Sequence, residues 1–104
     1  MSAERSMEKA AEKTVITVVG KDTVGIIAKV CTYLADNSIN VLDISQTIVQ
    51  DFFNMMMIVD LSTSTKPFDE CAAELEELGK GIGVAIQCQK EEILYDSLGN
   101  IQNI

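Results

Sequence analysis

The order of hydrophobic periodicities along the chain is the feature that most constrains its fold. Runs that alternate every second residue, or are β-branched throughout, indicate strands, and apolar positions three or four residues apart indicate helices. Six such segments follow one another between short polar or glycine-containing breaks. They are strand 14–19, helix 26–34, strand 39–50, strand 52–61, helix 68–78 and strand 84–89. The predicted order is therefore β-α-β-β-α-β.

This order predicts an α+β fold of the ferredoxin-like type, a four-stranded antiparallel sheet with both helices on one face and strand order 4-1-3-2. Residues 39–50 alternate apolar with polar side chains, with Val41 expected to point away from Ile44, so this strand is placed at an edge. Residues 52–61 are apolar on both faces and belong in the centre. Gly79 and Gly81 are expected to end the second helix.

The length of 104 residues allows one domain. We place the folded domain at residues 14–90. Residues 1–13 are polar and predicted to be a flexible extension, because they contain too little apolar surface to anchor them. Residues 91–104 are predicted to form a short C-terminal helix and a tail.

Composition excludes several classes of function. The chain has no histidine and a net charge of -8, and its single arginine is Arg5. Histidine-based catalysis and metal sites are absent, and an acidic surface disfavours nucleic acid and anionic membranes. The three cysteines have no C-x-x-C spacing. Their interpretation as buried, reduced thiols indicates a cytoplasmic protein.

Known uses of the ferredoxin-like fold can be compared with the residues present. Residues 14–19 contain no aromatic side chain for stacking RNA bases. Residues 20–25 contain neither the cysteine pair of a metal chaperone nor the arginine of an acylphosphatase-like enzyme. No nucleophile–base pair, metal set or phosphate loop is evident, so an enzyme is not expected.

The loop at residues 20–25 has the properties of an anion site, because it leads into a helix N-terminus whose amides lack intrahelical partners. A bound carboxylate with an α-ammonium group would need acceptors, and Asp22, Asn40 and Asp43 are available. Asp22 has an equally good interpretation as a simple N-cap. Gly25 has a further one, close packing of the helix on the sheet.

Two segments resemble the ACT-domain family, V-V-G-K-D-T-V-G-I-I-A-K-V at residues 18–30 and S-I-N-V-L-D-I at 38–44. Asp22 and Gly25 match the family's loop, and Ile39 and Asn40 match the pair that opens its second strand. The chain is most similar to stand-alone ACT proteins related to the repressor of the glycine cleavage system. The resemblance implies a regulatory domain without catalysis or cofactor that binds a small molecule, usually an amino acid.

The resemblance also implies a homodimer, since the ligand in this family often lies between the loop of one subunit and strand two of another. Edge strands lie side by side in one version, and open sheet faces lie back to back in the other. An unidentified effector protein would receive the signal. The alternative is an interaction module of the same fold without a ligand. The expected ligand-binding residues are Gly20, Lys21, Asp22, Thr23, Val24, Gly25, Ile26, Asn40, Val41, Leu42, Asp43 and Ile44.

Two further motifs have plain interpretations. Met55, Met56 and Met57 are expected to alternate between the core and a dimer interface rather than to bind a soft metal. The glycines of residues 79–83 imitate a dinucleotide-binding loop, but they follow a helix and enter a strand, which is the reverse of the Rossmann order.

Overall fold

The structure, a computed structural model, describes residues 12–21 and 24–91. The predicted extension and C-terminal helix therefore lie almost entirely outside the described residues. The six predicted elements are present in the predicted order. They are β1 (Lys13–Lys21), α2 (Ile26–Asp36), β2 (Asn40–Val49), β3 (Phe52–Asp60), α3 (Phe68–Ile82) and β4 (Val84–Lys90).

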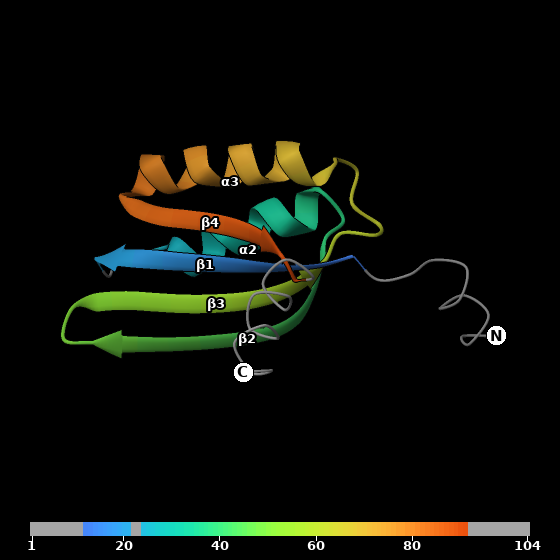
Figure 1. Cartoon of the computed structure of the whole chain (residues 1–104). Coiled ribbons are helices and arrows are strands. Elements are labelled where there is room, and N and C mark those ends of the chain that lie inside the picture. Colours follow the sequence, from blue (N-terminus) through green and yellow to red (C-terminus); the bar gives the residue numbers. More distant parts are fainter. Residues whose placement is uncertain (1–11, 22–23, 92–104) are drawn as a thin grey trace, which may run out of the picture.

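The four strands form one antiparallel sheet in the order β2-β3-β1-β4, which confirms the predicted topology (Figure 1). The central pair is β1 with β3, and their register places Ile16 opposite Met57 and Val18 opposite Met55. A tight turn at Gln50 and Asp51 joins β2 to β3. The edge strands are β2 and β4.

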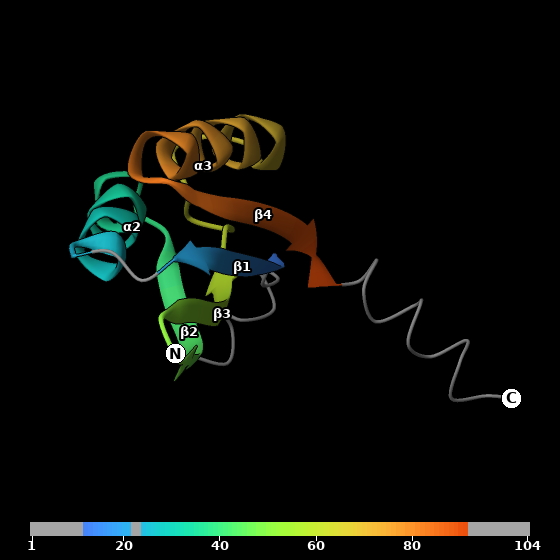
Figure 2. The same cartoon turned by 90° about the vertical axis from the view of Figure 1, so that its left-hand side faces the viewer.

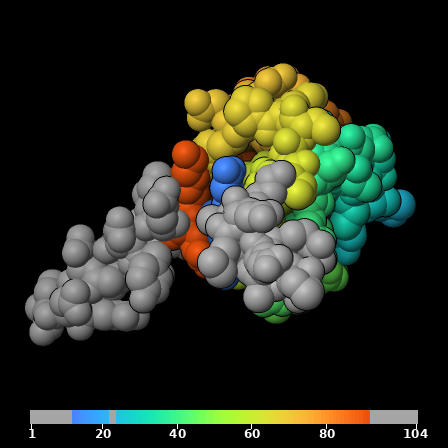
Figure 3. All heavy atoms as spheres, turned by 90° about the vertical axis from the view of Figure 1, so that its right-hand side faces the viewer, coloured from blue at the N-terminus to red at the C-terminus, as the bar shows by residue number. Residues whose placement is uncertain are grey.

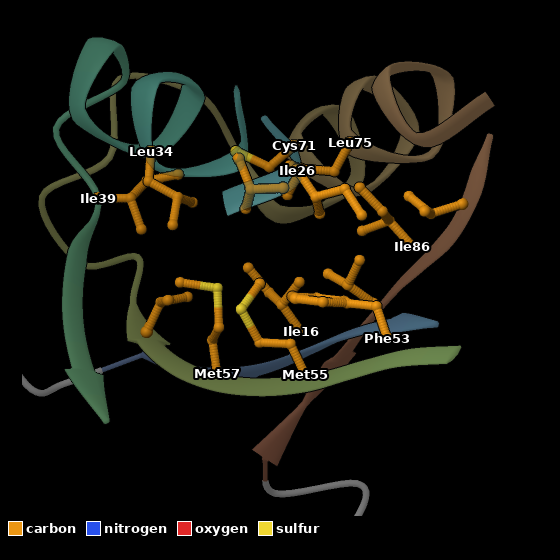
Figure 4. Close-up of a cluster of buried hydrophobic side chains, with 14 of the residues drawn as sticks. Ile16, Ile26, Leu34, Ile39, Phe53, Met55, Met57, Cys71, Leu75 and Ile86 are labelled. Carbon is orange, nitrogen blue, oxygen red and sulfur yellow. The ribbon is translucent and has the colours of Figure 1, made fainter. Parts of the chain in front are cut away.

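Both helices cover the same face of the sheet, so the molecule has two layers (Figure 2). The core lies between them, and Figure 4 shows its side chains directed into this space from both layers. Met55 and Met57 are fully buried there, whereas Met56 points to the other face and is 48% exposed. This alternation confirms the core position predicted for two of the three methionines.

Within residues 12–21 and 24–91, no helix covers the second face of the sheet, and we call it the open face. Residues opposite one another in an antiparallel sheet lie on the same face, so the strand register defines this surface. It consists of Lys13, Val15, Thr17, Val19, Lys21, Asn40, Asp43, Ser45, Thr47, Val49, Phe52, Asn54, Met56, Ile58, Asp60, Ala85, Gln87 and Gln89.

A β-bulge in the edge strand corrects one prediction. The register of β2 against β3 shifts between Val41 and Asp43, at Leu42. Val41 consequently lies opposite buried Val59, and Ile44 lies opposite buried Met57. The expectation that Val41 points away from Ile44 was wrong, because an extra residue at a bulge restores the same face three residues later.

The end of α3 corrects a second prediction. The helix continues through Gly79 and Gly81 to Ile82 and ends at Gly83, which has a left-handed φ of 83°. Gly79 is buried within the helix and faces β4 closely. A Cβ there would lie 2.7 Å from the carbonyl oxygen of Val84. Gly79 is therefore required for close helix–strand packing, and Gly83 is the residue that terminates the helix.

A polar network joins the two helices at their outer side. The Tyr33 hydroxyl donates to Glu74 Oε1 at 2.7 Å, and Lys66 Nζ donates to the same carboxylate at 2.8 Å. Burial, and then the hydrogen bond to Glu74, raise the pKa of the Tyr33 hydroxyl. The network fixes α2 relative to α3 and to the loop before it.

Asp60 organises the chain at the end of β3. Its Oδ1 accepts hydrogen bonds from the backbone amides of Ser62 and Glu12, each at 2.9 Å. Partial burial raises the pKa of Asp60, but these hydrogen bonds outweigh it and lower the pKa below its ordinary value. A lowered pKa in the folded state gives stability that is present above the unfolded pKa and is lost as the pH falls through the folded pKa.

We therefore expect Asp60→Asn to reduce the free energy of unfolding by about 1 kcal/mol at pH 7. The difference between wild type and variant should shrink as the pH falls below about 4. Urea unfolding at a series of pH values measures this, with Asp51→Asn in the exposed hairpin turn as the control. A difference that persists unchanged in acid would contradict the assigned role of the carboxylate.

Candidate functional site

The predicted ligand loop connects β1 to α2 at one end of the sheet. Lys21 is the last residue of β1, and α2 begins at Ile26 with Gly25 as its N-cap. Asp22 and Thr23 lie outside the described residues. Gly25 has a φ of 91°, a left-handed conformation that L-residues rarely adopt. Among the described residues, a Cβ at Gly25 would meet only Lys29 Cε, at 4.0 Å, so close packing against them does not explain this glycine. The left-handed backbone conformation explains why a glycine is present at this position.

The helix start has the properties of an anion site. Gly25 has no side chain with which to cap the first-turn amides of α2. These amides and the positive end of the helix dipole favour a carboxylate. Gly20 has a different role, because a Cβ there would lie 2.9 Å from Val84 Cγ1. The absence of a Cβ at Gly20 lets β4 begin beside the end of β1.

A groove lies between the start of α2 and the helix-side face of the edge strand. Its volume is about 320 Å³, which is near the lower end for small-molecule sites. The residues that line it are Gly25, Ile26, Ile27, Ala28, Gln46, Ile48 and Phe53. This groove brings the predicted residues Gly25 and Ile26 together with two residues of β2.

The electrostatics of the groove differ from those of the whole chain. The protein has a net charge of -8, yet none of the lining residues carries a carboxylate. Lys29 lies one turn into α2, close to Gly25. Gln46 is the polar side chain among the lining residues and offers both a hydrogen-bond donor and an acceptor. An apolar groove with a carboxylate-binding end and one amide suits a small zwitterion.

The second predicted half of the site, at the start of β2, lies at the opposite end of the same chain. Lys21 is opposite Phe52, which is opposite Val49, whereas Asn40 is opposite Asp60. Eight residue steps along a strand correspond to about 27 Å. Within one chain the loop therefore does not meet residues 40–44. A site that contains both segments needs two chains.

The pleat of β2 also separates the predicted residues by face. Asn40 and Asp43 have the register of the open face, whereas Val41 and Ile44 lie on the helix side. Asp43 Oδ1 accepts a hydrogen bond from its neighbouring amide, that of Ile44, at 2.9 Å. Two of the three predicted ammonium acceptors, Asn40 and Asp43, thus lie on the face opposite to the groove.

Sequence reasoning missed five of the lining residues, which are Ile27 and Ala28 of α2, Phe53 of β3 and, on β2, Gln46 and Ile48. The alternation of Gln46 and Ile48 with Ile44 indicates the helix-side face of β2. The sequence does not show that α2 begins above the C-terminal end of β2 rather than above its N-terminal end.

A larger hollow lies at the other end of the sheet. β1 begins and β4 ends side by side there (Figure 3). Its volume is about 460 Å³, and Lys90 Nζ lies 5.3 Å from the centroid of the Phe68 ring there. Glu12 and Glu91 line it together with Lys13. Charges of both signs already face one another in this hollow, so it has no net preference for an anion.

The family-model comparison decides the identity of the fold. A model described as the ACT domain matches residues 12–89, which is three quarters of the chain. The chain belongs to the ACT-domain family. Domains of this family are typically regulatory and bind small ligands rather than catalyse reactions.

Curated relatives of this ACT protein are similar over most of their length. A UPF0237 protein of Bifidobacterium longum is 62% identical over 81 residues, which cover 78% of this chain and 90% of the relative. A UPF0237 protein of Clostridium acetobutylicum is 52% identical over 89 residues, or 86% of this chain and 99% of the relative.

Solved structures have the same fold as this chain. An ACT domain protein from Streptococcus pneumoniae matches with a TM-score of 0.71 and 39% identity, covering 81% of this chain and 94% of that one. A candidate glycine cleavage system transcriptional repressor matches with a TM-score of 0.67 and 20% identity, covering 78% of this chain and 46% of that one. The second likeness shows a shared fold.

The thiols of this ACT domain are placed in or near the core. Cys71 is buried, and Cys31 and Cys88 are partly buried. Burial, with a smaller effect of Cys71, raises the pKa of the Cys88 thiol to about 12, so this group is neutral at physiological pH. Among residues 12–21 and 24–91, no group of three acidic or thiol side chains is arranged to hold a metal ion. No helix of this described part is long and apolar enough to cross a membrane.

Proposed function

We propose that this ACT domain is a cytoplasmic homodimeric sensor that binds a small amino acid in the groove between α2 and β2 and communicates its occupancy to an effector protein. The observation that carries the proposal is an apolar strip on the helix side of the edge strand, directly beside the groove. Ile44 is 45% exposed and Ile48 is 50% exposed, and Ile27 of α2 is exposed next to them.

The exposed strip favours pairing of two β2 strands edge to edge. Residues 43–49 contain one charged side chain, no lysine and no proline, so they lack the usual protection of an edge strand. A two-fold pair of β2 strands is antiparallel. Such a pair extends the sheet to eight strands and buries the apolar strips of both chains against each other.

The same arrangement completes the ligand site. Antiparallel pairing moves the start of the partner's β2 toward the groove end of this chain, which brings together the two predicted segments that one chain keeps apart. The ligand carboxylate binds the first-turn amides of α2, and Gln46 binds a polar group of the ligand. Because each groove borders the interface, ligand binding and dimerisation stabilise each other.

The proposal is tested by combining a ligand screen with a mass measurement. We expect at least one of the twenty amino acids, at millimolar concentration, to raise the melting temperature of the wild type by several degrees. Ile44→Lys should reduce the number of associated chains in light scattering. It should also abolish the ligand shift, although Ile44 does not line the groove.

Ala73→Lys on the exposed surface of α3 is the control for the added charge, and it should retain both the assembly and the ligand shift. No shift with any amino acid would refute the sensor and favour the ligand-free interaction module. A ligand shift that survives in monomeric Ile44→Lys would refute the shared site.

A further inference from the structure

The strand β4 is a sheet edge without the usual protection against pairing with another chain. Within the described residues it pairs with β1 alone, so the backbone groups on its outer side have no partner in the sheet. Residues 84–89 contain no charged side chain and no proline, and their register with β1 is continuous. Lysine, proline and bulges are the features that usually prevent an edge strand from pairing. Lys90 follows this stretch, but its Nζ lies 5.3 Å from the centroid of the Phe68 ring.

A hollow of about 290 Å³ opens along this edge, between β4 and the helix α3 that packs on it (Figure 2). The helix contributes Ala72 and Glu76 to its lining, and the strand contributes residues 86–89. Successive residues of a strand point to opposite faces, so a hollow that touches four consecutive residues lies beside the strand, at its outer edge. Ile86 and Cys88 have the register of the helix side and form the apolar part of the hollow with Ala72. An added strand could place a side chain there.

The helix above this edge presents carboxylates without partners. Glu76 lines the hollow, and Asp69 lies seven residues earlier in α3, on the same side of the helix. Both side chains are exposed, and neither has an ion pair or hydrogen bond with any residue that the structure describes. Glu77, the next residue of the helix, is paired with Lys80. Carboxylates without partners beside an apolar hollow favour an occupant that carries a basic side chain.

A second copy of this chain is a poor occupant of the edge. Pairing of two β4 strands about a two-fold axis would place both α3 helices on the same side of the joined sheet, next to the junction. Carboxylates of the two helices would then lie near one another, in a protein whose net charge is already -8. An extended segment of opposite charge can make the same main-chain hydrogen bonds without this repulsion.

We infer that β4 binds an extended segment of a partner protein as a further strand, with apolar side chains of that segment in the hollow and a basic side chain at Glu76. In this mode of recognition, main-chain hydrogen bonds provide affinity and pockets for alternate side chains provide specificity. β4 lies at the sheet edge opposite to β2. The inference is therefore independent of the ligand groove and of the edge pairing proposed above.

Fluorescence anisotropy with a labelled peptide and the full chain tests this surface. The probe Thr-Val-Thr-Arg-Thr-Val-Thr presents valine and arginine on one face of a strand and threonine on the other. We expect wild type to bind it, and glutamate in place of the arginine to weaken binding about tenfold. Glu76→Lys should reverse this preference and bind the glutamate peptide more tightly. Glu77→Lys adds the same charge on the other side of α3 and should bind both peptides like the wild type.

Backbone methylation of the peptide tests the binding mode. Amides of alternate residues in a strand point to the same side, so only one alternate set can donate to β4. Methylation of one set should abolish binding, and methylation of the other set should preserve it. Equal losses from the two sets would refute the addition of a strand.

The remaining outcomes concern the place of binding. Failure of wild type to bind the arginine peptide at millimolar concentration would overturn the inference. Equal effects of Glu76→Lys and Glu77→Lys would indicate attraction by net charge alone and would also overturn it. Ile44→Lys, the variant of the opposite edge, should bind the peptide like wild type even if the proposed dimer or ligand site is absent. Loss of peptide binding in Ile44→Lys would place the peptide on β2 instead. Thermal unfolding verifies that each variant is folded.

Discussion

Gly79→Ala is expected to destabilise the protein by about 2 kcal/mol, which is a large effect for one added methyl group. The new Cβ would lie 2.7 Å from the carbonyl oxygen of Val84 and 2.8 Å from Ile86 Cγ1. Since the first of these atoms belongs to the backbone of β4, relief requires α3 to move away from the sheet. The better helix propensity of alanine, about 1 kcal/mol, offsets only part of this strain.

Gly81→Ala is the matched control, because it is in the same helix and a Cβ there would have no atom of the described residues within 4 Å. The gain in helix propensity then acts alone, and we expect a stabilisation of about 0.5–1 kcal/mol. Urea unfolding at one fixed protein concentration measures both variants. Equal effects of the two substitutions would show that α3 does not approach β4 as closely as described.

Gly25→Ala is expected to weaken amino-acid binding about tenfold, which corresponds to about 1.4 kcal/mol. Alanine in a left-handed conformation is strained by roughly 1–2 kcal/mol. The free loop can relieve this strain by changing its shape, and binding must then restore the strained conformation. Calorimetry with the amino acid that stabilises the wild type most measures the dissociation constant.

Gly83→Ala provides the comparison for Gly25→Ala, since Gly83 has a similar φ of 83° and no described atom lies within 4 Å of its absent Cβ. Both variants should lose about 1 kcal/mol of stability, but Gly83→Ala should bind the ligand like the wild type. If Gly25→Ala binds the amino acid as tightly as the wild type, then binding does not depend on the conformation of this loop.

The sequence predicts the order of elements and the topology because both depend on short-range periodicity. The alternation in the methionine run indicated its core side correctly, since a strand has a fixed period of two. The limits of α3 were less accurate. A glycine inside a helix and a glycine after its end look the same in sequence. The structure distinguishes them by the contact of Gly79 with Val84 and by the left-handed φ of Gly83.

The site was less predictable than the fold. The loop before α2 carries its own signal in Gly25, because a left-handed residue and a helix start are local features. The groove depends on which part of β2 lies beneath α2, and this is a property of the assembled layers. Gln46 therefore had no local signal of function, while Asn40 and Asp43 had suitable chemistry on the other face.

The bulge at Leu42 determines how two copies of β2 can align. A regular ladder cannot pass through the irregularity, so continuous pairing of two such edges is confined to residues 43–49. The midpoint of this segment is Gln46, and a two-fold axis there places Ile44 of one chain opposite Ile48 of the other. The bulge thus limits the length of β2 that is available for pairing with a second copy. In the edge-paired dimer proposed above, the alignment with the longest continuous ladder would bring both groove amides close to the symmetry axis.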